Sequence, residues 1–254
     1  ILDNCVKYTV FDTVEQLQDA AVGGKDSYTY DVEYDVPGIG LYKEAVVHRV
    51  TNGISANYVD PYMRRRDPDT MSIADDKPTD KETFKAKFGY EFDSLKNETF
   101  DWLKSQELAV FLYFAGREGI GVGGIAIAPA NAGFFAMGLA MLQVMTSTQD
   151  IPEGFTIDSV IYVAPTFRHT HFKGKQAVVH NRTANRHDIF SYNLYPGPSA
   201  KKGLYGALLT KGEKEGWITA HCSTVRVTSP YDNICTFMHE GASGGGKSEM
   251  HQHI

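Results

Sequence analysis

The sequence is poor in cysteine and in positive charge. Its three cysteines, Cys5, Cys222 and Cys235, form neither an even set nor a Cys-x-x-Cys pair, so neither a disulfide framework nor a structural zinc site is indicated. This cysteine content favours a reducing, cytoplasmic location. The formal net charge is −6 at pH 7, and we expect no nucleic-acid partner because neutralising a phosphate backbone needs a clustered excess of Lys and Arg.

The sequence also lacks a continuous apolar run long enough to cross a membrane. Residues 119–149 contain no Asp, Glu, Lys or Arg, but Pro-Ala-Asn-Ala-Gly at 129–133 interrupts them. A spanning helix needs ~20 consecutive apolar residues, and each part here is shorter. We therefore expect a buried strand followed by a buried helix, and no membrane partner.

Apolar residues are nevertheless numerous enough for a substantial core. The chain has 254 residues, 42% of them hydrophobic, which predicts one large domain or two small ones. Strand-type and helix-type patterns mix without a regular repeat, and this mixture predicts an α/β or mixed α+β fold. The patterns predict a helix starting at 12–17, a hairpin of strands 27–35 and 41–51, helices within 77–106 capped by Thr79 or Asp80, and strands at 108–114, 155–164 and 176–180.

The C-terminal end carries the strongest motif. Residues 241–248 read Gly-Ala-Ser-Gly-Gly-Gly-Lys-Ser, which fits the P-loop pattern GxxxxGK[ST]. In that pattern the backbone N–H groups converge on phosphate oxygens, the lysine pairs with the β- and γ-phosphates, and the serine binds the metal ion. The predicted nucleotide-binding residues are Gly241, Ser243, Gly244, Gly245, Gly246, Lys247 and Ser248.

The segments around this motif fit the same interpretation. Residues 234–238 have the composition of a strand, and a helix whose N-terminus favours anions can begin at Ser248. Strand, loop and helix therefore follow in the order that a P-loop requires. The alternative is a flexible glycine linker, which has no reason to end in Gly-Lys-Ser after a strand.

Three weaker patterns carry less specific chemistry. Residues 119–124 satisfy GxGxxG, but Pro129 blocks the helix that a dinucleotide site requires, so we expect a tight structural loop. His169 and His171 could chelate a metal from one side of an extended segment, although surface histidines commonly have no such role. Basic clusters at 64–66 and 201–202 suit loops that bind carboxylates or phosphates, and the alternative is a solvated run of charge.

Several motifs in the C-terminal third occur together in one order. They are Phe-Thr-Ile followed by Ala-Pro within 155–165, Tyr195-x-Gly197 followed by Lys201-Lys202-Gly203, Ala-His-Cys-Ser at 220–223, and the P-loop. In this order they resemble phosphoenolpyruvate carboxykinase, particularly the ATP-dependent type. Lys202 and His221 stand 19 residues apart, a spacing similar to that of the family's metal-binding lysine and histidine. In a looser match, Arg65 or Arg66 corresponds to the family's arginine that holds the substrate carboxylate.

The resemblance implies a fold, a reaction and a set of residue roles. Residues 1–220 would form a carboxykinase-like N-terminal substrate domain with a mixed sheet, and 221–254 would begin a P-loop nucleotide-binding domain. Oxaloacetate and ATP (or GTP) would give phosphoenolpyruvate, the nucleoside diphosphate and carbon dioxide, with Mg²⁺ and Mn²⁺ as cofactors. Catalysis would fall to Lys202, Lys247, Arg65 and Arg66, substrate binding to Tyr195, Gly197 and Lys201, and metal binding to Lys202, His221 and Ser248.

Three features depart from that family. Its third metal ligand, an Asp downstream of the P-loop, would lie beyond the last residue of this chain, which stands six residues after Ser248. One residue is inserted between Gly197 and Lys201, and Gly245 replaces the usual Thr. We therefore expect the chain to be the N-terminal part of a longer protein, inactive alone, whose C-terminal half is its partner. The sequence as a whole is also similar to a family of longer, uncharacterised bacterial proteins, and that likeness implies no activity.

Two other functions remain open on the sequence. A kinase of the same fold could phosphorylate another acceptor, such as a hydroxy acid, a sugar or a protein serine. A nucleotide-sensing or structural module could bind ATP without turnover. The sequence does not decide between ATP and GTP, and it does not give the preferred metal or the oligomeric state.

Overall fold

The computed structural model describes residues 1–64, 68–75, 77, 79, 81–117, 120–142, 145–197, 199, 202–242 and 244–250. The chain forms two compact units, Ile1–Lys211 and Gly212–Ile254, and each is described by itself. The mixed α/β class expected from the sequence is confirmed. Among the described residues, no helix is both long enough and apolar enough to span a membrane.

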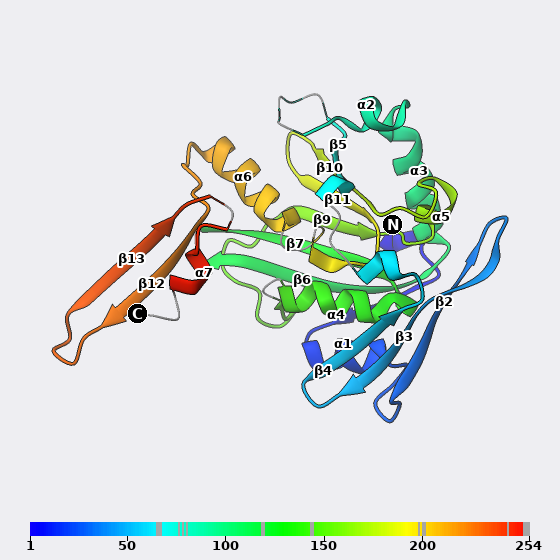
Figure 1. The fold of residues 1–254 in the computed structure, drawn as a ribbon, viewed down its shortest axis with the longest axis horizontal. Coiled ribbons are helices and arrows are strands. Elements are labelled where there is room, and N and C mark those ends of the chain that lie inside the picture. The colour runs from blue at the N-terminus through cyan, green and yellow to red at the C-terminus, as the bar shows by residue number, and fades with distance from the viewer. Residues whose placement is uncertain are drawn as a thin grey trace. The chain divides into compact units, whose positions relative to one another are not determined.

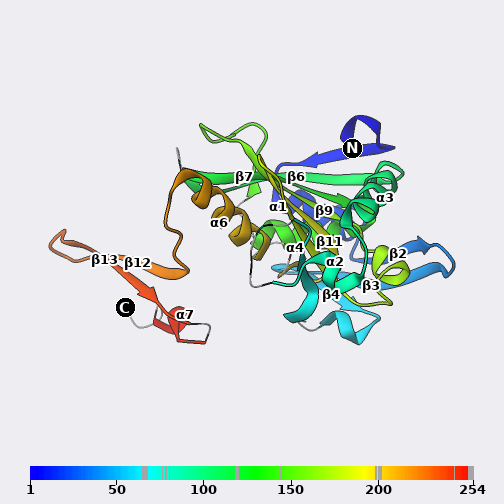
Figure 2. The same cartoon turned by 90° about the horizontal axis from the view of Figure 1, so that it is seen from above.

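The first unit is built around a mixed sheet of eight described strands (Figure 1). Seven of them follow the order β1, β6, β7, β9, β11, β10, β5, and β8 pairs with β6. Their bounds are β1 Lys7–Phe11, β5 Met71–Ile73, β6 Glu107–Arg117, β7 Ile120–Pro129, β8 Met145–Thr146, β9 Ile157–Val163, β10 Ala177–Arg182 and β11 His187–Tyr192. The antiparallel strands β6 and β7 run side by side in both views (Figures 1 and 2). The strands predicted at 108–114, 155–164 and 176–180 are therefore confirmed as β6, β9 and β10.

The sheet separates two hydrophobic cores because strand side chains alternate between its faces. On one face Phe111, Ile161 and Ile189 pack with helices α1 and α4. On the other face Val110 and Phe190 pack with helices α2, α3 and α5. The helix bounds are α1 Val14–Ala21, α2 Phe84–Phe88, α3 Phe92–Lys104, α4 Gly133–Leu142 and α5 Phe167–Thr170. Figure 1 shows α1 and α4 on the opposite side of the sheet from α2 and α3.

A three-stranded antiparallel sheet covers the first core beside α1 and α4 (Figure 1). It consists of β2 Thr29–Val36, β3 Gly40–Val50 and β4 Gly53–Tyr58. Val32 and Val47 point into the core and are fully buried. The β2–β3 turn needs glycine, since Gly38 and Gly40 have φ values of +78° and +88°. This sheet confirms the hairpin predicted from strands 27–35 and 41–51.

Helix α1 begins where its sequence predicts. Thr13 is the N-cap, and its hydroxyl accepts a 3.2 Å hydrogen bond from the backbone N–H of Gln16. The Gln16 side chain bonds back to the Thr13 N–H, completing a capping box. Leu17 is then fully buried against the sheet.

Two local predictions need correction. The helices predicted within 77–106 are present as α2 and α3, but the N-cap of α2 is Thr83 rather than Thr79, while Asp80 lies outside the described residues. Helix α2 ends at Gly89, whose φ of +82° cannot continue a right-handed helix. The GxGxxG segment does not form a loop, because its described residues from 120 onward belong to β7.

The second unit contains two described strands, the end of helix α6 and one short helix. Strands β12 Cys222–Thr228 and β13 Ile234–Glu240 form an antiparallel hairpin, followed by α7 Lys247–Met250. Helix α6, Gly203–Glu215, runs from the first unit into the second. Most hairpin side chains are exposed, including Met238 at 62%. The strand predicted at 234–238 is confirmed.

Candidate functional site

The P-loop motif adopts a compact turn between β13 and α7. Gly244 and Gly246 have φ values of +83° and +76°, a conformation that residues with a side chain rarely adopt. The N–H of Gly245 donates a 3.0 Å hydrogen bond to the carbonyl of Ala242, which closes the turn. The predicted order of strand, loop and helix is therefore present in the described residues of this segment.

Lys247 turns back over this loop. Its ammonium donates hydrogen bonds of 2.8 Å to the carbonyl of Gly241 and 2.9 Å to that of Ala242. The hydroxyl of Ser223 on β12 donates a 3.0 Å bond to the carbonyl of Lys247, which ties the start of α7 to the hairpin. A positive charge thus lies at the loop, held by two of its backbone carbonyls.

The predicted substrate loop lies in the first unit, close to α4. A Cβ added to Gly197 would lie 3.0 Å from Cε1 of Tyr195, so the ring of Tyr195 folds over this glycine. A Cβ added to Gly138 would lie 3.1 Å from Cγ of Pro196, which shows how closely the loop approaches α4. Lys202 is partly buried and directly precedes α6.

Other predicted site residues are not brought together by the described structure. Arg65, Arg66, Lys201 and Ser243 lie outside the described residues, and Ser248 is the second residue of α7. Lys202 belongs to the first unit and the exposed His221 to the second. Their pairing at a metal ion therefore stays a prediction.

The alternative metal site at His169 and His171 does not form a chelate. Nε2 of His169 bonds Glu44 at 2.9 Å, whereas Nε2 of His171 bonds Glu98 at 3.1 Å. The two imidazoles thus have carboxylate partners on different elements. No group of three or more His, Cys, Asp or Glu side chains in the described parts of the chain is arranged to hold a metal ion.

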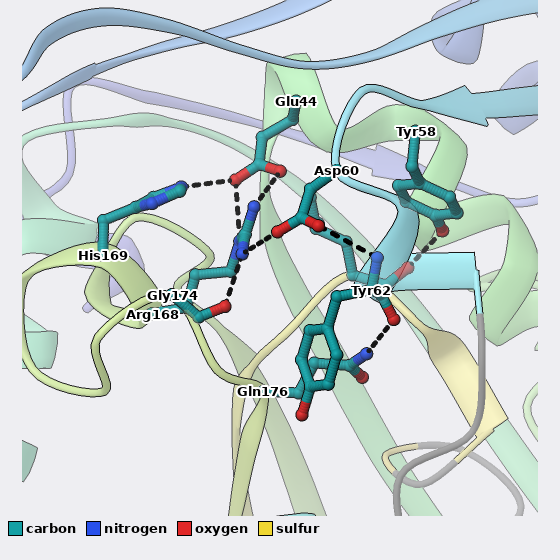
Figure 3. Close-up of polar contacts among 9 residues, drawn as sticks. Glu44, Tyr58, Asp60, Tyr62, Arg168, His169, Gly174 and Gln176 are labelled. Atoms are coloured by element: carbon teal, nitrogen blue, oxygen red, sulfur yellow. Dashed lines mark hydrogen bonds and ion pairs between the residues drawn. The ribbon is translucent and has the colours of Figure 1, made fainter.

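A buried polar cluster, which the sequence did not reveal, lies between β3, α5 and the segment after β4 (Figure 3). Arg168 is fully buried and forms two 3.0 Å bonds to the carboxylate of Glu44, which is buried as well. It also contacts Asp60 at 3.3 Å and the carbonyl of Gly174 at 2.6 Å. Burial raises the pKa of Glu44, but the hydrogen bonds from His169 and Arg168 outweigh it and leave that pKa below its ordinary value.

A second unpredicted feature is a chain of buried hydrogen bonds beneath α6. Nδ1 of His180 lies 2.8 Å from Nε2 of His187, whose Nδ1 lies 3.0 Å from the hydroxyl of Thr210. That hydroxyl donates to the carbonyl of Gly206 at 3.0 Å, so it accepts from His187, and His187 in turn accepts from His180. Nε2 of His180 is therefore unprotonated, and burial, together with repulsion from His187 when that ring is protonated, lowers the pKa of His180 to about 3.

The chain belongs to the family described as domain of unknown function DUF4914, whose model matches residues 1–254. A comparison of the sequence with curated proteins finds no match.

Proposed function

We propose that the chain supplies the phosphate-binding part of a nucleotide-dependent phosphoryl-transfer protein. The observation that carries this proposal is the loop after β13, where Gly244 and Gly246 adopt positive φ and Lys247 places its ammonium on the loop carbonyls. The β- and γ-phosphates of a nucleotide are anionic, so they attract the Lys247 ammonium more strongly than the neutral carbonyls do. Lys247 would exchange its carbonyl partners for phosphate oxygens when the nucleotide binds.

The proposed reaction is that of a phosphoenolpyruvate carboxykinase. Oxaloacetate would lose carbon dioxide, and the resulting enolate oxygen would attack the γ-phosphate, with ADP as the leaving group. The chain's residues would neutralise and position the reactants, which is the main contribution of a protein to phosphoryl transfer. Lys247 would hold the phosphates, while Tyr195 and Arg65 or Arg66 would orient the carboxylate substrate.

Mg²⁺ and Mn²⁺ are the cofactors that this proposal requires. Lys202, His221 and Ser248 are the proposed ligands, and Lys202 would have to bind as the neutral amine. Ser248 and the nucleotide phosphates would supply the oxygen ligands that Mg²⁺ and Mn²⁺ prefer. When bound, the metal would neutralise charge on the transferring phosphoryl group.

We further infer that another part of the polypeptide packs on the hairpin of the second unit. Tyr231 in the turn and Met238 on β13 are 86% and 62% exposed, and a two-stranded hairpin alone is marginally stable in water. This exposure supports the proposal that a C-terminal half completes the nucleotide site. The cysteine content supports a cytoplasmic location for the whole protein.

The test is formation of phosphoenolpyruvate from oxaloacetate, ATP and Mn²⁺ by the full-length gene product, with Lys247→Ala as the matched variant. We expect product from the parent and a nucleotide affinity reduced about tenfold or more in the variant, because the ammonium–phosphate bonds are lost. Unchanged nucleotide binding in Lys247→Ala would remove the central claim.

Two other outcomes of this experiment assign a different function. Nucleotide binding that depends on Lys247, without phosphoenolpyruvate, would support a kinase of the same fold, to be assayed with hydroxy acids, sugars and protein serines. Tight ATP binding with no transfer to any of these acceptors would support a non-catalytic ATP-binding module.

A further inference from the structure

The buried cluster begins at an irregularity in β3. Ala45 pairs with Val32 and Lys43 pairs with Glu33, so Glu44 is the extra residue of a β-bulge. A bulge redirects side chains, and here two consecutive residues, Glu44 and Ala45, are both fully buried. The bulge therefore directs the Glu44 carboxylate into the protein interior, where it forms an ion pair with Arg168.

Arg168 is the centre of this cluster. Its guanidinium is fully buried and donates to Glu44, Asp60 and the carbonyl of Gly174. A buried guanidinium without partners would strongly destabilise the folded protein. The three partners therefore have to keep fixed positions around Arg168. Asp60 is a partner that reaches the protein surface, since its side chain is 30% exposed to solvent.

Asp60 fixes the start of the segment that runs toward the arginine cluster. Its second carboxylate oxygen accepts a 2.9 Å hydrogen bond from the N–H of Tyr62, at the beginning of the short helix Pro61–Arg64. The amide of Gln176 donates to the carbonyl of the same tyrosine at 3.4 Å. Met63 is fully buried in the first core, so the segment is also held by packing.

The same end of the small sheet holds the other predicted substrate loop. The phenol of Tyr58, the last residue of β4, donates a 2.6 Å hydrogen bond to the carbonyl of Leu194, next to Tyr195 (Figure 3). Burial, together with the nearby charge of Glu44, raises the pKa of Tyr58 well above its ordinary value, so the phenol stays protonated as a donor. Tyr58 and Asp60 are two residues apart in sequence. Tyr58 thus holds the loop at Leu194, and Asp60 holds the segment at Tyr62.

We propose that Tyr58 and Asp60, anchored by the Glu44–Arg168 pair, are positioning residues for a dicarboxylate site between segments 60–64 and 194–197. This inference rests on the proposed function, which assigns the carboxylate substrate to Tyr195 and to Arg65 or Arg66, the residues that follow segment 60–64 in the sequence. The positioning residues do not touch the substrate themselves. They act by holding the two loops at one separation, so that binding groups on both can reach a single ligand.

Calorimetry on the full-length gene product tests this, with malonate as a stable dicarboxylate probe and MgATP titrated separately. Tyr58→Phe removes one hydrogen bond, and Asp60→Ala removes the contacts to Tyr62 and Arg168. We expect each variant to weaken malonate affinity about fivefold or more while MgATP affinity stays within about twofold. Asp60→Asn keeps an acceptor for the Tyr62 N–H and is expected to recover most of the lost affinity.

Matched controls come from β2 and the residue that precedes it. Tyr28→Phe alters a tyrosine that is 73% exposed, and Asp31→Ala alters a surface carboxylate paired with Lys43, so both are expected to leave malonate affinity unchanged. Unchanged malonate affinity in both Tyr58→Phe and Asp60→Ala would overturn the inference. Absence of malonate binding by the parent would also overturn it, whereas MgATP binding that still depends on Lys247 would show that the nucleotide proposal stands.

Discussion

At the scale of single residues, His180 shows how burial turns a common side chain into one with an unusual acid–base property. Its Nε2 atom has no hydrogen-bond partner among the residues that the structure describes, and burial, His187 and Arg182 together lower its pKa from 6.5 to about 3. Between these two values the unfolded chain binds a proton that the folded chain does not. Stability from this residue is therefore complete above pH 6.5 and is lost as the pH falls toward 3.

We predict that the free energy of unfolding decreases from pH 7 to pH 5, in part because of His180. One titrating group contributes at most about 1.4 kcal/mol per pH unit. His180→Phe removes this group, so its urea midpoint should depend less on pH over the same range, whatever its stability at pH 7. The control is His48→Gln, which alters an imidazole bonded to the surface residue Thr29. Equal pH dependence in the parent and His180→Phe would contradict the prediction.

At the scale of elements, Gly121 and Gly124 of β7 make room for the aromatic side chains of Phe114 and Tyr113 on β6. A Cβ added to Gly124 would lie 2.6 Å from the carbonyl oxygen of Ser159 and would also overlap the ring of Tyr113. Tyr113 is fully buried, and its phenol hydrogen-bonds the Ser159 hydroxyl, so neither neighbour can move freely. These glycines therefore serve packing within the sheet.

We predict that Gly124→Ala destabilises the protein by about 3 kcal/mol, the upper part of the range for overpacking a well-ordered core. Gly154→Ala is the matched control, because its φ is +74° but no atom lies within 4 Å of an added Cβ. Its cost should be about 1 kcal/mol, from backbone strain alone. Urea denaturation measures both, and equal losses would show that packing around Gly124 does not matter.

The sequence predicted these elements unevenly, for physical reasons. Helix α1 has its capping residues in the sequence, and β6 and β9 are apolar runs, so local patterns were sufficient. The GxGxxG segment was wrongly expected to be a loop, because what favours a strand there is the aromatic partners on β6. Helix α6 was not predicted, since its apolar positions give only a weak helical periodicity.

The candidate site shows the same limit. The P-loop pattern could be found in the sequence because its residues are adjacent, and its role in binding a nucleotide stays a proposal. The cluster around Arg168 joins residues 108 and 124 positions away, so no local pattern contained it. The bulge at Glu44 was equally hidden, because it is defined by the register against β2.

At the scale of the whole molecule, the two units differ in what they bury. The first contains both hydrophobic cores, whereas the second consists mainly of a hairpin with exposed apolar side chains. We predict that residues 1–211, expressed alone, unfold cooperatively in urea, and that a peptide of residues 212–254 shows no cooperative transition. Circular dichroism during denaturation measures both. A cooperative transition of the isolated peptide would contradict the proposal that this hairpin needs a further part of the protein.

The two-sided sheet has a consequence for how this family can change over evolution. Neighbouring residues of β6, such as Val110 and Phe111, belong to different cores that are covered by different helices. Compensating substitutions should therefore couple residues that share a face, such as Phe111 and Ile161, more strongly than residues adjacent in the chain. The side chains on one face of the sheet can then change independently of those on the other face. Both faces depend on the same β6 backbone, so the conformation of that backbone has to be conserved.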